Sequence, residues 1–232
     1  MPSIDLSDLR VLVLGGSGVL GSSIARELAS AGARVMLAGR DADRLQAAAS
    51  AIGRDVPSVL FDLRKPYHAD HVVDTAIARL GGLDGIVNAA GVVAFGPFRE
   101  LSDETLDDVA QTDFLGPLRV MQRAVNRMDG GLFVHLTGVV AERPMPGMAI
   151  YSAAKAGLAA ASAALVRELR REGFHVLDAR PPHTETGLAT RPIAGAAPAM
   201  PEGLDPTHVA RVVVDGLRSG TRELPADVFS PA

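Results

Sequence analysis

Two side chains that can handle a proton, Tyr151 and Lys155, stand four positions apart in the segment YSAAK. Residues with this spacing lie on one face of an α-helix. A free tyrosine has a pKa of about 10, which makes it a poor proton relay at neutral pH. A neighbouring ammonium group stabilises the phenolate and lowers that pKa. The pair therefore indicates general acid–base chemistry, with Tyr151 giving or taking the proton.

A glycine-rich turn, LGGSGVLGSS, joins a short apolar run to an amphipathic stretch near the N-terminus. Gly15, Gly18 and Gly21 follow the spacing G-x-x-G-x-x-G. Glycines let such a turn adopt positive φ, and the start of the following helix presents free N–H groups to an anion. This context predicts a site for the pyrophosphate of a dinucleotide. The other residues expected to contact the coenzyme in this turn are Ser17, Val19 and Leu20.

The ends of the next strands supply further candidate contacts. Arg40 stands where an NAD(H) site would place an acidic residue for the ribose hydroxyls. A guanidinium there can pair with a 2′-phosphate, so we expect NADP(H) rather than NAD(H), the alternative being an ordinary solvated charge. The remaining candidates lie at the ends of the third and fourth predicted strands: Asp62, Leu63, Asn88, Ala89, Ala90 and Gly91.

These residues are spread along an alternation of strand-like and helix-like segments. Runs rich in β-branched residues or leucine predict strands at 10–15, 33–39, 58–63, 82–91, 131–138, 174–180 and 222–229. Helical spacing predicts helices at 22–32, 41–53, 66–82, 101–128, 146–173 and 205–220. Such alternation predicts an α/β doubly wound parallel sheet of about seven strands with helices on both faces. No polar linker divides the chain, so we expect one domain over residues 1–232.

The composition argues against several classes of function. A net charge of -4 and the absence of any basic run argue against nucleic-acid binding. The chain has no cysteine, and its histidines form no metal-ligand pattern, so we expect no disulfide and no metal. The N-terminal segment lacks the apolar region of a signal peptide, and Lys155 interrupts the longest apolar run. We therefore expect a cytoplasmic protein without a membrane span.

In their order along nearly the whole chain, the motifs VLGGSGVLG, NAAG, YSAAK and RPPHTETG resemble the short-chain dehydrogenase/reductase family. The resemblance implies a Rossmann fold, a nicotinamide coenzyme and hydride transfer between that coenzyme and a carbonyl or alcohol carbon. Tyr151 matches the family's catalytic tyrosine, and Lys155 matches the lysine that also holds the nicotinamide ribose. The segment after the sixth strand is similar to the family's nicotinamide-binding segment, which implies contacts from Pro181, Thr184 and Thr186.

The most consequential departure from the family's pattern is at position 138. The residue 13 places before Tyr151 is glycine, where the family has a serine that polarises the substrate oxygen. Losing one such donor can cost about 3–4 kcal/mol of transition-state stabilisation. Thr137 is the neighbouring hydroxyl, although successive strand residues point to opposite faces. Glu142 and a backbone N–H near Gly138 are the other candidates.

Two further departures concern the proton path and the glycine turn. Asp113, in TDFLGP, replaces the asparagine that links the family's lysine to water. An ionised aspartate accepts hydrogen bonds but donates none, and it places a negative charge near Lys155. Val19 takes a position that is glycine in most single-domain members, while Gly18 restores the spacing of longer members, so we expect nucleotide binding to persist.

The longest irregular segment, residues 181–205, follows the sixth strand and starts at the edge where such sheets bind ligands. Leu188, Ile193 and Met200 within it indicate an apolar substrate, and His183 is either a pocket residue or a solvated one. The alanine-rich helix at 146–173 is similar to the family's dimer-forming helix, which implies a homodimer or homotetramer. High intrinsic helix propensity explains the alanines equally well.

Three functions remain compatible with this sequence. The first is an NADP(H)-dependent oxidoreductase that uses Tyr151 and Lys155, with Thr137 and Asp113 as adapted partners. The second is a catalytically impaired NADP(H)-binding sensor or structural protein on the same fold. The third is a non-redox enzyme, such as an isomerase or lyase, in which Tyr151 still moves a proton. Retention of the Tyr–Lys pair favours the first function, and the missing serine and asparagine keep the second open.

Overall fold

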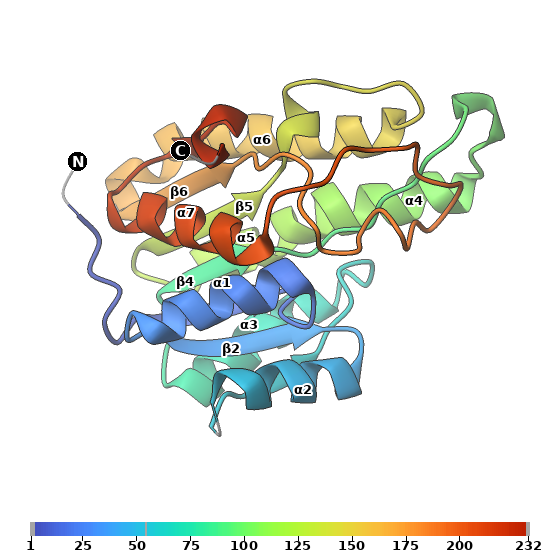
Figure 1. The fold of residues 1–232 in the computed structure, drawn as a ribbon. Coiled ribbons are helices and arrows are strands. Elements are labelled where there is room, and N and C mark those ends of the chain that lie inside the picture. The colour runs from blue at the N-terminus through green and yellow to red at the C-terminus, as the bar shows by residue number, and fades with distance from the viewer. Residues whose placement is uncertain (1–2, 54, 231–232) are drawn as a thin grey trace.

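The computed structural model of the chain describes residues 3–53 and 55–230. All strands of these residues join one parallel sheet with the order β3-β2-β1-β4-β5-β6-β7 (Figure 1). The strands are β1 (Arg10–Leu14), β2 (Arg34–Gly39), β3 (Ser58–Leu60), β4 (Gly85–Asn88), β5 (Gly131–Leu136), β6 (Phe174–Ala179) and β7 (Glu223–Leu224). The α-helices are α1 (Val19–Ser30), α2 (Ala42–Ile52), α3 (His68–Leu80), α4 (Asp103–Ala110), α5 (Gly116–Val125), α6 (Ala149–Glu168) and α7 (Pro206–Arg218).

The direction in which strands are added reverses between β1 and β4. From β1 the chain moves outwards through β2 to β3, and it then returns to place β4 on the other side of β1. Ligands of open parallel sheets bind beyond the carboxyl ends of the strands at such a switch point. Leu14 of β1 pairs with Asn88 of β4 at that edge. The predicted doubly wound sheet is therefore confirmed, and the segments that follow β1 and β4 start side by side.

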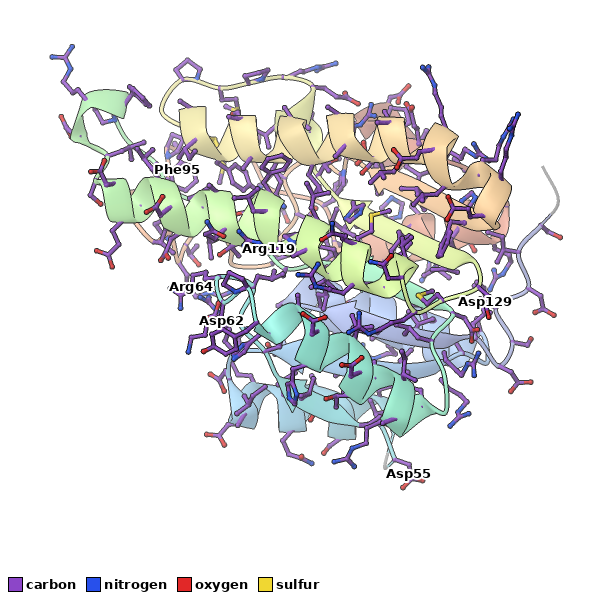
Figure 2. The ribbon with its side chains drawn as sticks, turned by 180° about the vertical axis from the view of Figure 1, so that it is seen from behind. Asp55, Asp62, Arg64, Phe95, Arg119 and Asp129 are labelled. Atoms are coloured by element: carbon purple, nitrogen blue, oxygen red, sulfur yellow. The ribbon has the colours of Figure 1, made fainter. Side chains whose placement is uncertain are left out.

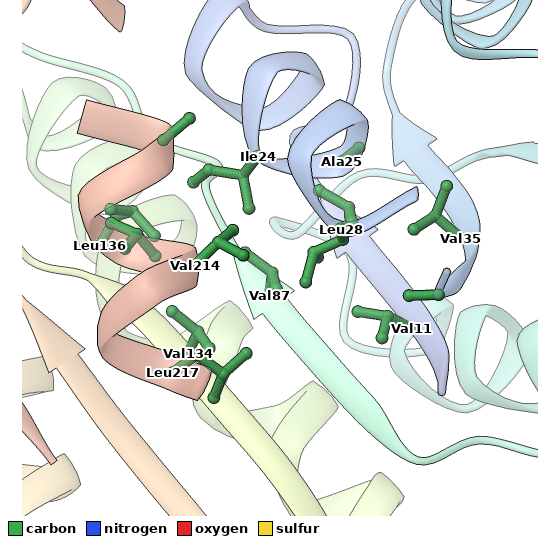
Figure 3. Close-up of a cluster of buried hydrophobic side chains, with 14 of the residues drawn as sticks. Val11, Ile24, Ala25, Leu28, Val35, Val87, Val134, Leu136, Val214 and Leu217 are labelled. Atoms are coloured by element: carbon green, nitrogen blue, oxygen red, sulfur yellow. The ribbon is translucent and has the colours of Figure 1, made fainter. Parts of the chain in front are cut away.

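Each face of the sheet is covered by helices. Successive strand residues point to opposite faces, so Val11 lies in one buried cluster with Ile24 of α1 and Val214 of α7 (Figure 3). Leu12 faces the other way and packs in a cluster with Met121 of α5. Figure 1 shows α1 and α7 in front of the sheet and α3 and α5 behind it. Burial on both faces explains why the strands read as continuous apolar runs.

Local signals set most of the helix ends. The side chains of Asp41 and Ser102 accept backbone N–H groups at the starts of α2 and α4, and Gly81 ends α3 with a left-handed φ of 76°. Several predicted boundaries are wrong. The helix α3 begins at His68, so Pro66 lies before it rather than in its first turn. The third strand ends at residue 60, the fourth covers only 85–88, and the seventh covers only 223–224 and is followed by a 3₁₀ turn at 226–229.

The long helix predicted at 101–128 is interrupted by a π-helical turn, Gln111–Leu115, between α4 and α5. The Gly116 N–H bonds to the Gln111 carbonyl, five residues back. In an α-helix the Asp113 carbonyl would accept the N–H of residue 117. Residue 117 is proline and has no N–H, so this hydrogen bond cannot form. The wider turn directs both Thr112 and Asp113 inwards, where they are buried. Turns of this kind are frequent at functional sites.

The segment 181–205 is anchored against the loop that follows β4. The Ile193 N–H donates to the Val93 carbonyl (2.8 Å), and the Phe95 N–H donates to the Ala194 carbonyl (2.9 Å). These bonds form a parallel bridge between Ala94 and Ala194. The segment therefore runs across the carboxyl edge of the sheet on a defined path.

The helix that carries Tyr151 and Lys155 is long and apolar. Among the described residues, α6 with the 3₁₀ turn after it, Ala149–Glu172, is the one segment that passes a membrane-span test of length and composition. Core helices of soluble proteins pass the same test, so the result is weak evidence for a membrane. In this fold α6 packs against β6 and the π-turn and buries Lys155 and Leu158.

Candidate active site

A cavity of about 830 Å³ lies at the carboxyl edge of the sheet. Of the residues predicted from the sequence, those that line it are Gly15, Ser17, Gly18, Val19, Leu20, Gly21, Arg40, Asp62, Leu63, Ala89, Ala90, Gly91, Thr137, Tyr151, Lys155, Pro181, Thr184 and Thr186. Asn88 and Asp113 are buried and do not line it. The coenzyme contact expected at Asn88 stays a prediction, and its side chain lies within the sheet layer.

The glycine turn forms a cradle that side chains would fill. Gly15 has a φ of 74°, and a Cβ there would lie 2.6 Å from the Ala90 nitrogen. A Cβ on Gly21 would lie 2.3 Å from the Gly15 carbonyl oxygen. Neither contact is tolerable, so the close approach of the turn to the end of β4 requires these glycines.

The start of α1 is suited to an anion. The N-cap is Gly18, which has no side chain to accept the first N–H groups of the helix. The first turn of α1 contains no acidic residue. The first N–H groups of a helix have no intrahelical partner and carry a partial positive charge. Because Gly18 and its neighbours line the cavity, the cradle and the helix start together fit the pyrophosphate of a dinucleotide.

Two arginines stand at the end of the cavity where the adenosine ribose would bind. Arg40 follows β2 and is exposed, and Arg44 in the first turn of α2 donates from Nη2 to the Ser17 carbonyl (3.1 Å). Both line the cavity. The intervening carboxylate, Asp41, caps α2 by accepting the Arg44 N–H (3.0 Å). Arg44 escaped prediction because nothing in the sequence shows that α2 turns this residue back toward the glycine turn.

Asp62 is held by an arginine that the sequence analysis also missed. Arg64 Nη2 lies 2.8 Å from Asp62 Oδ2, and Arg64 Nη1 lies 3.0 Å from Asp108 Oδ2 on α4. Figure 2 shows Asp62 and Arg64 side by side, near α4 and the start of α3. The hydrogen bonds from Arg64 hold the pKa of Asp62 below its ordinary value. These two salt bridges of Arg64 fix the loop after β3. Both Arg64 and Asp62 line the cavity.

Tyr151 and Lys155 meet on the opposite wall, as their spacing predicts. Lys155 Nζ lies 5.7 Å from the centre of the Tyr151 ring. The same ammonium donates to the Leu136 carbonyl (3.1 Å) and lies 3.1 Å from Asp113 Oδ1. Asp113 Oδ2 accepts the Val92 N–H (3.2 Å). The negative charge that the sequence places near Lys155 is therefore in direct ion-pair contact with it.

The electrostatics of this group differ from the sequence-based expectation. Burial lowers the pKa of Lys155, but Asp113 and Tyr151 outweigh burial, so the pKa lies above its ordinary value. Burial raises the pKa of Tyr151; the Lys155 charge opposes this rise and the Asp113 charge adds to it. Lys155 thus acts in the expected direction, yet the net shift of the phenol is upward.

The segment around position 138 offers little in place of a serine hydroxyl. Gly138 has a φ of 77°, and its N–H donates to the Ala179 carbonyl (3.3 Å). The Thr137 hydroxyl is buried and donates to the Asp178 carboxylate on β6. The carboxylate of Glu142 is paired with Arg180 (3.0 Å). All three predicted substitutes are therefore engaged with β6 or with the arginine that follows it.

A row of polar side chains lies under the floor of the cavity. Asn88, His135 and Asp178 are register partners on β4, β5 and β6, so they point to one face of the sheet. All three are buried. Asp178 is paired with Arg180, 2.7 Å from Nε to Oδ2, whereas Asn88 and His135 have no hydrogen-bond partner for their side chains among the described residues.

Much of the remaining wall of the cavity is apolar. The three apolar residues predicted from the 181–205 segment, Leu188, Ile193 and Met200, all line it. Further apolar lining residues come from the loops after β4 and β5: Val92, Val93, Phe95, Val140, Met145 and Met148. Arg191 is a charged residue among the lining residues. Phe95 lies between α4 and α6 in Figure 2. His183 also lines the cavity, and its Nε2 lies 3.3 Å from Glu185 Oε1.

The sequence comparisons agree with this architecture. Residues 10–194 match the family described as short chain dehydrogenase. An uncharacterized oxidoreductase of Methylorubrum extorquens is 31% identical over 191 residues, which cover 80% of this chain and 77% of the relative. An uncharacterized oxidoreductase of Staphylococcus aureus is 28% identical over 216 residues, 91% of this chain and 92% of the relative. The chain therefore belongs to the short-chain dehydrogenase/reductase family.

Solved structures show the same likeness. A short chain dehydrogenase from Burkholderia cenocepacia in complex with NADP superposes with a TM-score of 0.85, at 28% identity, covering 96% of this chain and 98% of that one. A dehydrogenase/reductase from Sinorhizobium meliloti has a TM-score of 0.84 at 28% identity, covering 96% and 95%. This protein is thus an oxidoreductase of the short-chain type with a Rossmann-type sheet.

Proposed function

We propose that this oxidoreductase uses NADP(H) and transfers hydride between the nicotinamide and a carbonyl or alcohol carbon of a small apolar molecule. The observation that carries the proposal is that one cavity joins the glycine cradle, the start of α1 and the Tyr151–Lys155 pair. Its apolar wall suits a substrate without charged groups.

The choice of NADP(H) is supported by the two arginines at the ribose end. Arg40 and Arg44 both line that part of the cavity, and Asp41 is occupied as the cap of α2. Guanidinium groups pair well with phosphate. The Burkholderia cenocepacia relative, whose structure holds NADP, is in line with this choice.

When bound, the coenzyme supplies or accepts the hydride. Tyr151 holds the proton that the substrate oxygen gains or loses. Lys155 has three N–H donors; one reaches the Leu136 carbonyl, and the ammonium forms an ion pair with the Asp113 carboxylate. We assign a further donor of Lys155 to a ribose hydroxyl on the nicotinamide side, since Lys155 lines the cavity. The apolar wall excludes water from the reacting carbon.

The site would work without a serine hydroxyl on the substrate oxygen. Position 138 is glycine, and the neighbouring Thr137 hydroxyl is committed to Asp178. Tyr151 would then be the main polarising group, at a cost of about 3–4 kcal/mol in the barrier relative to a site with the extra donor. This observation also favours a second candidate, a catalytically impaired NADP(H)-binding sensor or structural protein.

The two candidates separate in a binding and turnover experiment. NADPH and NADH are titrated by coenzyme fluorescence, and NADPH oxidation is then followed over a panel of apolar ketones and aldehydes. We expect tighter binding of NADPH and slow turnover, with Tyr151→Phe losing about 100-fold or more of the turnover while keeping coenzyme affinity. Tight binding with no turnover across the panel supports the sensor, and no binding of either coenzyme overturns both candidates.

We further propose a cytoplasmic homodimer or homotetramer assembled through α6. The exposed face of this helix is rich in small residues, Ala153, Ala160 and Ala163 among them. Small side chains allow two helices to approach closely. An apolar helix that is exposed along one face in a single chain is also what a subunit interface requires.

A further inference from the structure

Lys155 does not stand in the fold as an isolated ammonium group, because a carboxylate is buried with it. Asp113 Oδ1 lies 3.1 Å from Lys155 Nζ, and the side chains of Asp113 and Lys155 are 0% and 5% exposed. The Val92 N–H fixes the other carboxylate oxygen, and the Leu136 carbonyl fixes the ammonium. Backbone groups therefore hold both members of the pair in position.

Three separate elements converge to admit this pair. The π-turn directs Asp113 inwards, and α6 supplies Lys155. The strand β4 leads to Gly91, where a Cβ would lie 2.7 Å from Asp113 Oδ1 and 3.4 Å from Lys155 Nζ. A side chain at position 91 would therefore separate the carboxylate from the ammonium.

The pair determines the charge that faces the phenol. Tyr151 experiences Lys155 on its own helix and Asp113 on the π-turn. Burial raises the pKa of Asp113, while the Lys155 charge and the Val92 N–H oppose this rise and favour the carboxylate. His135 on β5 also faces Lys155, and it is neutral because burial lowers its pKa. Asp178 on β6 also acts on Lys155, but it is already paired with Arg180. An isolated ammonium stabilises a phenolate, whereas an ammonium with a carboxylate at ion-pair distance leaves only a weak dipolar field.

We propose that Asp113 neutralises Lys155 and thereby keeps Tyr151 protonated at neutral pH, which sets the site for proton donation and hence for carbonyl reduction. Asp113 is a positioning residue in this scheme, since it acts through Lys155. The assigned direction of hydride transfer rests on the redox function proposed above. The assigned protonation state of Tyr151 does not depend on that function.

The reductive step balances with one external proton. The carbonyl carbon gains a hydride from the reduced nicotinamide coenzyme as the C=O π electrons pass to oxygen. That oxygen takes the Tyr151 proton as the phenol O–H bond breaks, and a solvent proton then restores the phenol. Each turnover consumes one ketone or aldehyde, one NADPH and one proton. Alcohol oxidation needs the phenolate and is therefore confined to alkaline pH.

The tyrosine content makes the protonation state directly measurable. The chain has two tyrosines and no tryptophan, and the other tyrosine, Tyr67, is 67% exposed. In a Tyr67→Phe background, the near-ultraviolet absorbance of tyrosinate reports Tyr151 alone, with circular dichroism confirming the fold at each pH. We expect Tyr151 to ionise above the ordinary value of about 10 and Asp113→Asn to lower its pKa by about one unit or more. Asp107→Asn, an exposed carboxylate on α4, is the matched control and should leave the pKa unchanged.

Two outcomes overturn the proposal: ionisation of Tyr151 below the ordinary phenol value, or a titration that Asp113→Asn does not move. The first outcome needs no change at Asp113, so it stays decisive if that variant does not fold. The titration uses neither coenzyme nor substrate. Absence of NADPH binding would therefore contradict the proposed function and leave the result of this titration unaffected. With a substrate in hand, Asp113→Asn should move the alkaline limit of reduction to lower pH by the same amount.

Discussion

At the scale of single residues, the polar row beneath the cavity contains an imidazole that stays neutral. His135 is buried, and neither ring nitrogen has a hydrogen-bond partner among the described residues. Burial, assisted by the charge on Lys155, lowers its pKa to about 4. The imidazolium form is therefore excluded at neutral pH, and protonation of His135 opposes the folded state.

This environment predicts an acid-dependent loss of stability that His135→Gln removes. The unfolded chain binds the proton near pH 6.5 and the folded chain only near pH 4, so stability is retained above 6.5 and falls as the pH drops toward 4. Between pH 7 and about pH 4.5 the wild type should lose about 2 kcal/mol more of unfolding free energy than the variant. Urea unfolding at the two pH values measures the difference. Equal losses in the two proteins would show that His135 titrates normally in the fold.

Sequence reasoning at this scale identified the residues whose partners are close along the chain. Tyr151 and Lys155 are one helical turn apart, so their spacing alone predicts that they meet. Asp113 was identified only as a charge near the lysine, and the ion pair itself depends on the π-turn. The engagement of Thr137 with Asp178 joins residues 41 positions apart, a contact that depends on the strand order of the sheet.

At the scale of elements, the glycine turn and the π-turn position the site, and the two were not equally predictable. The turn after β1 could be predicted from its glycine spacing, because a close approach of two backbone segments requires glycine at that position. The π-turn was predicted as plain helix, since helical periodicity continues through it. Pro117 was the available signal, because a proline removes the hydrogen bond on which an α-helix through Asp113 would depend.

The close packing of the glycine turn predicts that Gly21→Ala damages both the fold and the site. A Cβ at Gly21 would lie 2.3 Å from the Gly15 carbonyl oxygen, so the turn must move. We expect a loss of about 1–3 kcal/mol in unfolding free energy together with weaker NADPH binding. Gly53→Ala is the control, because the nearest atom to its Cβ, on Val56, is 3.8 Å away. Chemical unfolding and coenzyme titration of both variants provide the measurements, and equal stability of the two would contradict the clash.

At the scale of the whole molecule, the sheet and its covering helices followed from the alternation of segments, whereas the assembly of subunits stays a prediction. Strand–helix alternation with right-handed crossovers predicts a parallel sheet covered on both faces, whereas the order of the strands in that sheet comes from the structure. Subunit contacts depend on exposed surfaces. The alanines on the surface of α6 are explained equally well by high helix propensity and by a subunit interface.

The proposed assembly predicts a mass of about two or four times 24.1 kDa in light scattering. Ala163→Arg, on the exposed face of α6, should shift the protein toward the single-chain mass, because a buried guanidinium without a partner opposes association. Ala47→Arg places the same charge on the exposed face of α2 and should leave the mass unchanged. A wild-type mass of 24.1 kDa would remove the assembly proposal.

The left-handed backbone at Gly138 bears on how such a site can change over time. With φ at 77°, a Cβ added at this residue would have only the Pro181 carbonyl oxygen nearby, at 3.6 Å, so crowding is no obstacle to a larger residue. The obstacle is conformational, since this combination of φ and ψ is almost confined to glycine and costs another residue about 1–3 kcal/mol. A Gly138→Ser change would therefore find room for its side chain but strain the loop, and a second change that lets this backbone relax should improve such a variant.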